Sequence, residues 1–136
     1  MTSDATASQG PLAGLKLLVV DDQFLVASLA EDIVLEAGAH EAVLATNESE
    51  ARTALERPDR FDGAVIDVNL GDRPGFELAR ALLKSGIPFV FATGYGGDIA
   101  LPDEFRGIPV VAKPYTAEML VAPLAEAIRR GAKDRA

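Results

Sequence analysis

The 136-residue sequence contains no cysteine and a single histidine. Without cysteine there is no disulfide framework, no thiolate chemistry and no cysteine-based metal site. No apolar run approaches the roughly 18 residues that a membrane-spanning helix needs. The N-terminus also lacks a basic stretch followed by an apolar one, so no signal peptide is indicated. We therefore expect a cytoplasmic protein that does not enter a membrane.

Basic residues are scarce relative to acidic ones. Lys and Arg number 13 against 21 Asp and Glu, which gives a net charge of −8. Nucleic acids and anionic membranes are bound through clustered basic residues, so neither is expected as the main partner. With 49% hydrophobic and 25% charged residues, the composition is that of a globular protein, and the length fits one domain.

Short apolar runs alternate with stretches of helical periodicity along most of the chain. We expect a flexible N-terminal tail over 1–14, one folded domain over 15–131 and a C-terminal tail over 132–136. The predicted strands are 15–20, 40–45, 63–66, 87–92 and 108–112, and the predicted helices are 23–37, 47–56, 75–84 and 116–130. This alternation is typical of an α/β fold with a parallel sheet covered by helices on both faces.

Local signals mark several ends and faces of these helices. Asn47 followed by Glu50 has the form of a capping box, and Thr116 is placed to cap the last helix. Three glycines and Pro102 between 93 and 107 predict one short, poorly held turn in place of a regular fourth helix. Pro123, inside the last predicted helix, predicts that this helix is kinked or restarts there. Helical spacing assigns further residues to buried positions: Val26, Leu29, Ala30, Ile33, Val34, Ala37, Leu78, Ala79, Leu82 and Leu83, with Phe24 and Phe76 also expected to pack.

Four predicted strands end on charged or reactive side chains: Asp21 with Asp22, Asp67, Thr93 and Lys113. Each is weak evidence alone, because such residues commonly cap helices or lie in turns. The carboxyl ends of parallel strands, however, form the crevice where ligands bind. Three neighbouring carboxylates favour a hard divalent cation such as Mg²⁺. A cation, a lysine and a hydroxyl around one carboxylate are suited to phosphoryl transfer onto that carboxylate.

This set of residues, at these spacings, resembles the receiver domain of bacterial two-component response regulators over about residues 15–131. The resemblance implies a flavodoxin-like, doubly wound, five-stranded parallel sheet of order 2-1-3-4-5. It implies that Asp67 is the phosphoacceptor and that Mg²⁺ is the cofactor. Asp22 would bind the metal directly and Asp21 mainly through water, while Asn69 would contribute its backbone carbonyl.

The same resemblance implies that Thr93 hydrogen-bonds a phosphoryl oxygen and that Lys113 pairs with the phosphoryl charge. Two positions depart from the family pattern: Gly71 replaces a usual proline, and Val110 replaces a usual aromatic switch residue. The strings 91–95 (FATGY) and 113–115 (KPY) are similar to the single-domain FATGUY subfamily. The conformational switch is therefore predicted in the glycine-rich segment 94–107. Phosphorylation would order this segment and reposition Tyr95 and Tyr115.

The function that the resemblance implies is that of a stand-alone, monomeric response regulator. A sensor histidine kinase or a histidine phosphotransfer protein would phosphorylate Asp67, and the signal would pass to an unknown downstream protein. The domain could instead serve as a phosphate sink. It would not be an enzyme, apart from self-phosphorylation by small donors and autodephosphorylation.

The alternatives are a degenerate receiver used only as a scaffold and a Mg²⁺-dependent phosphatase that forms an aspartyl-phosphate intermediate. The phosphatase is disfavoured because Asn69 stands where a second acid would be needed and no cap domain is present.

Overall fold

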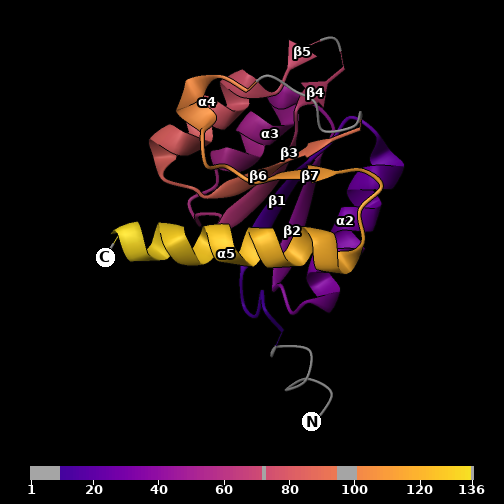
Figure 1. The fold of residues 1–136 in the computed structure, drawn as a ribbon, viewed down its shortest axis with the longest axis vertical. Coiled ribbons are helices and arrows are strands. Elements are labelled where there is room, and N and C mark those ends of the chain that lie inside the picture. The colour runs from indigo at the N-terminus through magenta and orange to yellow at the C-terminus, as the bar shows by residue number, and fades with distance from the viewer. Residues whose placement is uncertain (1–9, 72, 95–100, 136) are drawn as a thin grey trace.

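The structure, a computed structural model, describes residues 10–71, 73–94 and 101–135 (Figure 1). Its elements are β1 (Lys16–Val20), α2 (Phe24–Glu36), β2 (Glu41–Ala45), α3 (Glu48–Leu55), β3 (Gly63–Asp67), β4 (Asn69–Leu70), β5 (Arg73–Pro74), α4 (Phe76–Ser85), β6 (Phe89–Thr93), the 3-10 helix η1 (Asp103–Phe105), β7 (Val110–Ala112) and α5 (Ala117–Arg135). In the described part of the chain, no helix has the length and apolar character needed to cross a bilayer.

Five parallel strands form the central sheet in the order β2-β1-β3-β6-β7. Numbered along the chain, this is the order 2-1-3-4-5, so the predicted fold class is confirmed. Helices α2 and α5 cover one face, and α3 and α4 cover the other (Figure 1). The strand order reverses between β1 and β3, which is where such folds place their binding crevice.

Two hydrophobic cores lie on the two faces of the sheet. Leu17 and Val19 of β1 face the core beneath α2 and α5, whereas Leu18 and Val20 face the core beneath α3 and α4. Side chains alternate in this way because successive residues of a strand point to opposite faces. All five residues of β3 are buried, which accounts for its continuous apolar run up to Asp67.

The predicted helix caps are confirmed. The backbone N–H of Glu50 donates to Asn47 Oδ1 at 2.8 Å, and that of Met119 donates to Thr116 Oγ1 at 3.3 Å. Gly86 ends α4 with φ of 74°, in the left-handed region that glycine adopts without strain. The predicted short turn corresponds to η1. It is not poorly held, because its Phe105 is fully buried against Phe76, Phe89 and Phe91.

Three residues assigned to buried positions are in fact exposed. Leu29, Leu83 and Phe24 expose 44%, 41% and 62% of their surface. Helix α2 buries Ala27, Ala30, Ile33 and Val34, a narrow stripe from which Leu29 and Phe24 point away. Helix α4 likewise buries Leu78, Ala79 and Leu82 but leaves Leu83 at its flank. The predicted faces were therefore too wide.

The last helix is longer than predicted. α5 passes through Pro123 as one element and ends at Arg135, so the alternative of a restart at Pro123 is wrong. Buried Leu120, Leu124 and Ile128 anchor both halves of the helix on the sheet. At Gly131 the helix lies so close to Pro88, the residue before β6, that an added Cβ would be 2.9 Å from Pro88 Cγ.

Residues 10–14 form a docked turn, whereas the sequence predicted a flexible tail up to residue 14. Leu12 is fully buried, and its N–H donates to the carbonyl oxygen of Ala37 at 3.0 Å. Packing therefore begins earlier than the expected boundary at Leu15. The glycines and proline of this segment gave no periodic signal, and a single buried leucine provides the contact.

Candidate functional site

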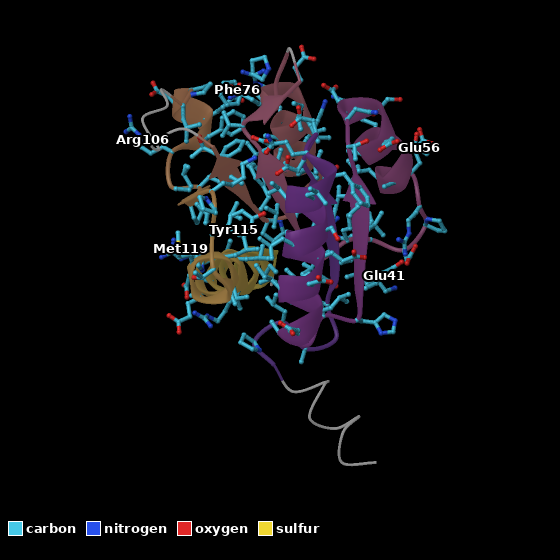
Figure 2. All side chains as sticks on the ribbon, turned by 90° about the vertical axis from the view of Figure 1, so that its right-hand side faces the viewer. Glu41, Glu56, Phe76, Arg106, Tyr115 and Met119 are labelled. Carbon is cyan, nitrogen blue, oxygen red and sulfur yellow. The ribbon has the colours of Figure 1, made fainter. Side chains whose placement is uncertain are left out.

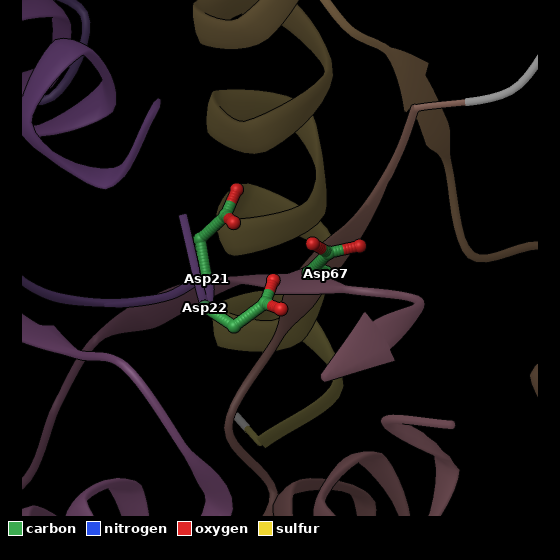
Figure 3. Close-up of side chains that lie close together, drawn as sticks. All are labelled: Asp21, Asp22 and Asp67. Carbon is green, nitrogen blue, oxygen red and sulfur yellow. The ribbon is translucent and has the colours of Figure 1, made fainter. Parts of the chain in front are cut away.

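The side chains that the sequence singled out at four strand ends lie together in the structure. Asp21 directly follows β1, Asp67 ends β3, Thr93 ends β6 and Lys113 directly follows β7. Figure 3 shows the carboxylates of Asp21, Asp22 and Asp67 gathered at this edge of the sheet. Asp21, Asp67 and Thr93 are only 3%, 4% and 1% exposed, while Asp22 is open to solvent.

Both carboxylate oxygens of Asp67 have a hydrogen-bond donor. The backbone N–H of Asn69 donates to Oδ1 at 3.0 Å, and the Lys113 ammonium donates to Oδ2 at 2.9 Å. Burial is the main cause that raises the pKa of Asp67, and these two hydrogen bonds oppose it, while the charge of Asp21 adds to the rise. The carboxylate is thus held in a fixed position, in surroundings that favour additional positive charge.

Lys113 joins two of the carboxylates. Its Nζ is 2.9 Å from Asp67 Oδ2 and 3.1 Å from Asp21 Oδ2, with the side chain largely buried. Burial alone would lower the pKa of Lys113, but its hydrogen bonds with Asp67 and Asp21 outweigh that effect and raise the pKa above its usual value. The lysine therefore carries a full positive charge at the centre of the site.

The two consecutive acids also fix the loops around the site. Asp21 Oδ1 accepts from the N–H of Gln23 at 2.9 Å, and Asp22 Oδ2 accepts from the N–H of Gly71 at 3.1 Å. The first contact forms a turn that leads the chain into α2, but it does not cap the helix, because Gln23 is the N-cap and α2 has no side-chain cap hydrogen bond. The second ties the β4–β5 hairpin to the acidic pair. Gly71 has φ of 71°, so this turn suits glycine.

The donor set fits a hard divalent cation. One oxygen from each of Asp21, Asp22 and Asp67 lies within 4.8 Å of the others. Three carboxylates and one ammonium leave the site with an excess of negative charge that a divalent ion can balance. Carboxylate and carbonyl oxygens are the ligands that Mg²⁺ prefers. The residues present are therefore compatible with the predicted metal.

An open pocket of about 540 Å³ leads from the surface to Asp67. One wall consists of the charged site, and the other includes Val26 and Leu29 of α2 together with Tyr115. Tyr115 lies between α2 and the start of α5 (Figure 2) and is only 5% exposed. Burial and the charges of Asp21 and Asp67 raise the pKa of Tyr115 to about 12. Leu29, which the sequence assigned to the core, is instead a wall of this pocket.

The Thr93 end of the site is only partly described. The carbonyl oxygen of Thr93 accepts from the N–H of Lys113 at 2.7 Å, which fixes the two residues relative to each other. A Cβ added to Gly94 would be 3.8 Å from Lys113 Cε, an ordinary contact. Tyr95 and residues 96–100 lie outside the described part of the chain, so the predicted switch segment is described only at Gly94 and over 101–107. The buried Phe105 is an anchor in that segment that the sequence did not reveal.

Comparison with curated proteins gives one match of moderate similarity. The chain is 30% identical over 118 residues to the Sensor protein TorS of Escherichia coli (strain K12). The match covers 80% of this chain and 12% of that protein, so the chain spans a small part of its relative. No protein-family model matches the chain.

Solved structures resemble the chain over nearly its whole length. A putative response regulator from Chloroflexus aurantiacus J-10-fl is 27% identical with a TM-score of 0.74, covering 86% of this chain and 99% of that one. A response regulator receiver domain protein (CheY-like) from Methanospirillum hungatei JF-1 is 24% identical with a TM-score of 0.73, covering 90% and 99%. The narrower similarity to the FATGUY subfamily stays a prediction. The chain has the fold of response regulator receiver domains, and the resemblance inferred from its motifs is confirmed.

Proposed function

We propose that the protein is a response regulator of a two-component phosphorelay and that Asp67 accepts the phosphoryl group. The observation that carries the proposal is the arrangement around Asp67. It is the carboxylate that lies at the base of the pocket between the acidic pair and Lys113. The similarity to response regulator receiver domains supports this role.

The transfer requires an exposed path, a fixed nucleophile and positive charge. A carboxylate oxygen of Asp67 supplies the electron pair for the new bond to phosphorus. The bond from phosphorus to the donor's histidine nitrogen breaks, and its electron pair stays on the imidazole. The Asn69 N–H and the Lys113 ammonium hold the carboxylate in place before attack. Lys113 then balances charge on the phosphoryl group, and the Thr93 hydroxyl is proposed to hydrogen-bond one of its oxygens.

Mg²⁺ fits the same proposal as the cofactor. Asp21, Asp22 and Asp67, with the backbone carbonyl of Asn69, are the residues that would hold it, Asp21 mainly through water. When bound, the ion supplies positive charge that stabilises the phosphoryl oxygens during transfer. The oxygens of these three carboxylates through which an ion would be held already lie close together in the structure.

The proposed donor is a sensor histidine kinase or a histidine phosphotransfer protein in the cytoplasm. The surface around the pocket supports a protein donor, because the first turns of α2, which line the pocket with Val26 and Leu29, also expose Phe24 and Leu25. Apolar side chains on a pocket rim are typical of protein contacts. The stand-alone arrangement, the downstream protein, the monomeric state and the phosphate-sink role stay predictions.

Phosphorylation of purified protein tests the proposal. The wild type, incubated with Mg²⁺ and acetyl phosphate, should gain one acid-labile phosphoryl group, and Asp67→Ala should gain none while keeping its circular dichroism spectrum. Uptake at the wild-type level by Asp67→Ala would refute the assignment. Repeated turnover of phosphoester substrates would instead favour the phosphatase alternative, which the exposed Asn69 two residues after Asp67 disfavours.

A further inference from the structure

A second hollow lies between α2 and α5, away from the phosphoacceptor pocket. It has a volume of about 640 Å³ and shares no lining residue with that pocket. Its α5 side is formed by residues 118, 121, 122, 125, 126 and 129, and its α2 side by residues 33, 36 and 37. We call it the α2–α5 groove. The α5 positions follow one another at three- and four-residue spacing, so they form one continuous stripe along the helix.

This stripe adjoins the face that holds α5 on the sheet and shares with it the buried Val121. Leu120, Leu124 and Ile128 are buried beneath the helix, while Ala122 and Ala125 remain accessible in the groove. Figure 1 shows α5 crossing in front of the sheet with α2 beside its N-terminal half. Small side chains along a helix allow another backbone to approach closely, at the 8–10 Å between axes usual for packed helices.

The rim of the groove is acidic. Glu36, Glu118 and Glu126 line it together with one base, Arg129. Arg129 already pairs with Glu126, and so does the neighbouring Arg130. Glu36 and Glu118 have no basic partner in the part of the chain that the structure describes. Two acidic side chains therefore flank an apolar floor without compensation.

The position of Glu36 strengthens this observation. Glu36 is the last residue of α2, whose last turn contains no basic residue. A negative charge there faces the negative end of the helix dipole and is unfavourable for the isolated helix. Local helix stability therefore does not explain this acid, whereas a basic ligand on the rim would.

The size and charge of the groove select one kind of occupant. A second copy of this chain would bring two acidic rims together in a protein that already carries a net charge of −8. From Ala117 to Arg129 the α5 side extends for about 18 Å at 1.5 Å per residue, the length of a helix of about three turns. We propose that the α2–α5 groove docks an amphipathic helix of a partner protein, with apolar side chains on the alanines and basic side chains against Glu36 and Glu118.

A designed peptide probes this proposal without knowledge of the natural partner. The probe is a fluorescent helical peptide of about four turns with leucines on one face and lysines flanking them. A second peptide carries glutamates in place of the lysines. Titration of the full chain should show saturable binding of the lysine peptide alone. Amide chemical-shift changes should be concentrated at 33–37 and 117–129. Shifts centred on another face, or no saturable binding, would overturn the proposal.

Charge reversal separates a local contact from general electrostatic attraction. The double variant Glu36→Lys with Glu118→Lys should bind the lysine peptide at least about tenfold more weakly than the wild type does. It should also gain affinity for the glutamate peptide. The matched control, Glu56→Lys with Glu77→Lys, makes the same change of net charge on the α3 and α4 side and should keep the wild-type preference. An equal loss in both double variants would contradict a specific groove. Ala122→Gln, which adds bulk to the floor of the groove, should lower the affinity of the lysine peptide.

Discussion

At the scale of single residues, Asp22 differs from the other carboxylates of the acidic site. Asp21 and Asp67 both contact the Lys113 ammonium, whereas Asp22 accepts only a backbone N–H from Gly71. Its charge is therefore the least compensated in a group of three carboxylates. Like charges at this separation destabilise the metal-free protein, and a bound cation removes that cost.

The substitution Asp22→Asn should accordingly have opposite effects on metal binding and on stability. We expect weaker Mg²⁺ binding by calorimetry. We also expect a rise in the free energy of unfolding without metal on the order of 1 kcal/mol, because one repulsive charge is lost. Asp32→Asn, an exposed acid of α2 outside the cluster, is the control and should change neither quantity. Unchanged Mg²⁺ affinity in Asp22→Asn would remove Asp22 from the metal site.

Tyr115 gives the site a dependence on pH in the alkaline range. A tyrosine in an unfolded chain titrates near 10, whereas the pKa of Tyr115 is raised to about 12. Between these values the folded protein keeps a proton that the unfolded chain has lost. The contribution of Tyr115 is therefore complete below pH 10 and is lost as the pH rises toward 12.

We expect the free energy of unfolding of the wild type to fall over this interval by roughly 2 kcal/mol more than that of Tyr115→Phe. Urea titrations at several pH values measure this difference. Phenolate absorbance provides a second readout, because the chain has two tyrosines and no tryptophan and the variant keeps only Tyr95. If the two proteins lose stability in parallel, Tyr115 is not protected in the way the structure indicates.

At the scale of elements, the turn from β3 into α4 brings the backbone of Gly75 against that of Asp67. The N–H of Gly75 donates to the carbonyl oxygen of Val68 at 2.6 Å. A Cβ at Gly75 would be only 2.4 Å from the carbonyl oxygen of Asp67. Since both neighbours are backbone atoms, this contact cannot be relieved by a side-chain rotation.

Gly75→Ala should therefore lower the free energy of unfolding by about 2 kcal/mol or more and slow phosphorylation, because it displaces Asp67. Gly94→Ala is the matched control for stability: its added Cβ makes only an ordinary contact. Denaturant titration of both variants measures the effect. Equal stability of the two variants would show that the β3–α4 turn has room that the structure does not indicate.

A substitution in the first turn of α2 distinguishes phosphorylation by a protein donor from phosphorylation by a small-molecule donor. Leu25 in the first turn of α2 is 82% exposed, so its replacement should not affect folding. Leu25→Ser should slow phosphoryl transfer from a histidine phosphotransfer protein about tenfold or more, while phosphorylation by acetyl phosphate should keep its wild-type rate. Leu83→Ser, a 41%-exposed leucine on α4, should change neither rate. Equal slowing with both donors would place the effect in the chemistry and not in docking.

The elements that the sequence predicted well are those with strong local signals. Strand β3 was found because every residue up to Asp67 is buried, and α3 was found because Asn47 caps it through a real hydrogen bond. The failures share a different cause, since they depend on contacts between distant segments. Leu12 docks against the end of α2, Phe105 completes an aromatic cluster, and Leu29 lines a pocket together with Tyr115, which lies far from it in the sequence.

The candidate site was predictable for the same reason that the fold was. Its side chains directly follow or end strands, and parallel strands deliver their carboxyl ends to one edge. The sequence could therefore group Asp21, Asp67, Thr93 and Lys113 without coordinates. It could not show that Lys113 contacts two carboxylates at once or that Asp22 is tied to the β4–β5 hairpin, because those contacts depend on rotamers and loop geometry.

At the scale of the whole molecule, the fold separates two surfaces with different chemistry. The strand-end pocket combines buried charges with an apolar rim, and the α2–α5 groove combines an apolar floor with an acidic rim. Both lie beside α2, and Thr116, the cap of α5, directly follows Tyr115 of the pocket wall. A donor at Asp67 and a partner helix in the groove would therefore contact the same pair of helices at different places.

The most direct test of the central claim is to locate the phosphoryl group chemically. Protein treated with Mg²⁺ and acetyl phosphate is reduced with borohydride, which converts an aspartyl phosphate to homoserine, and its peptides are sequenced by mass spectrometry. Phosphorylation of Asp67 predicts homoserine at position 67 alone, and Asp67→Asn predicts none at any position. Homoserine at position 21 or 22 in the wild type, or a phosphorylated protein without homoserine, would contradict the assignment of Asp67 as the phosphoacceptor.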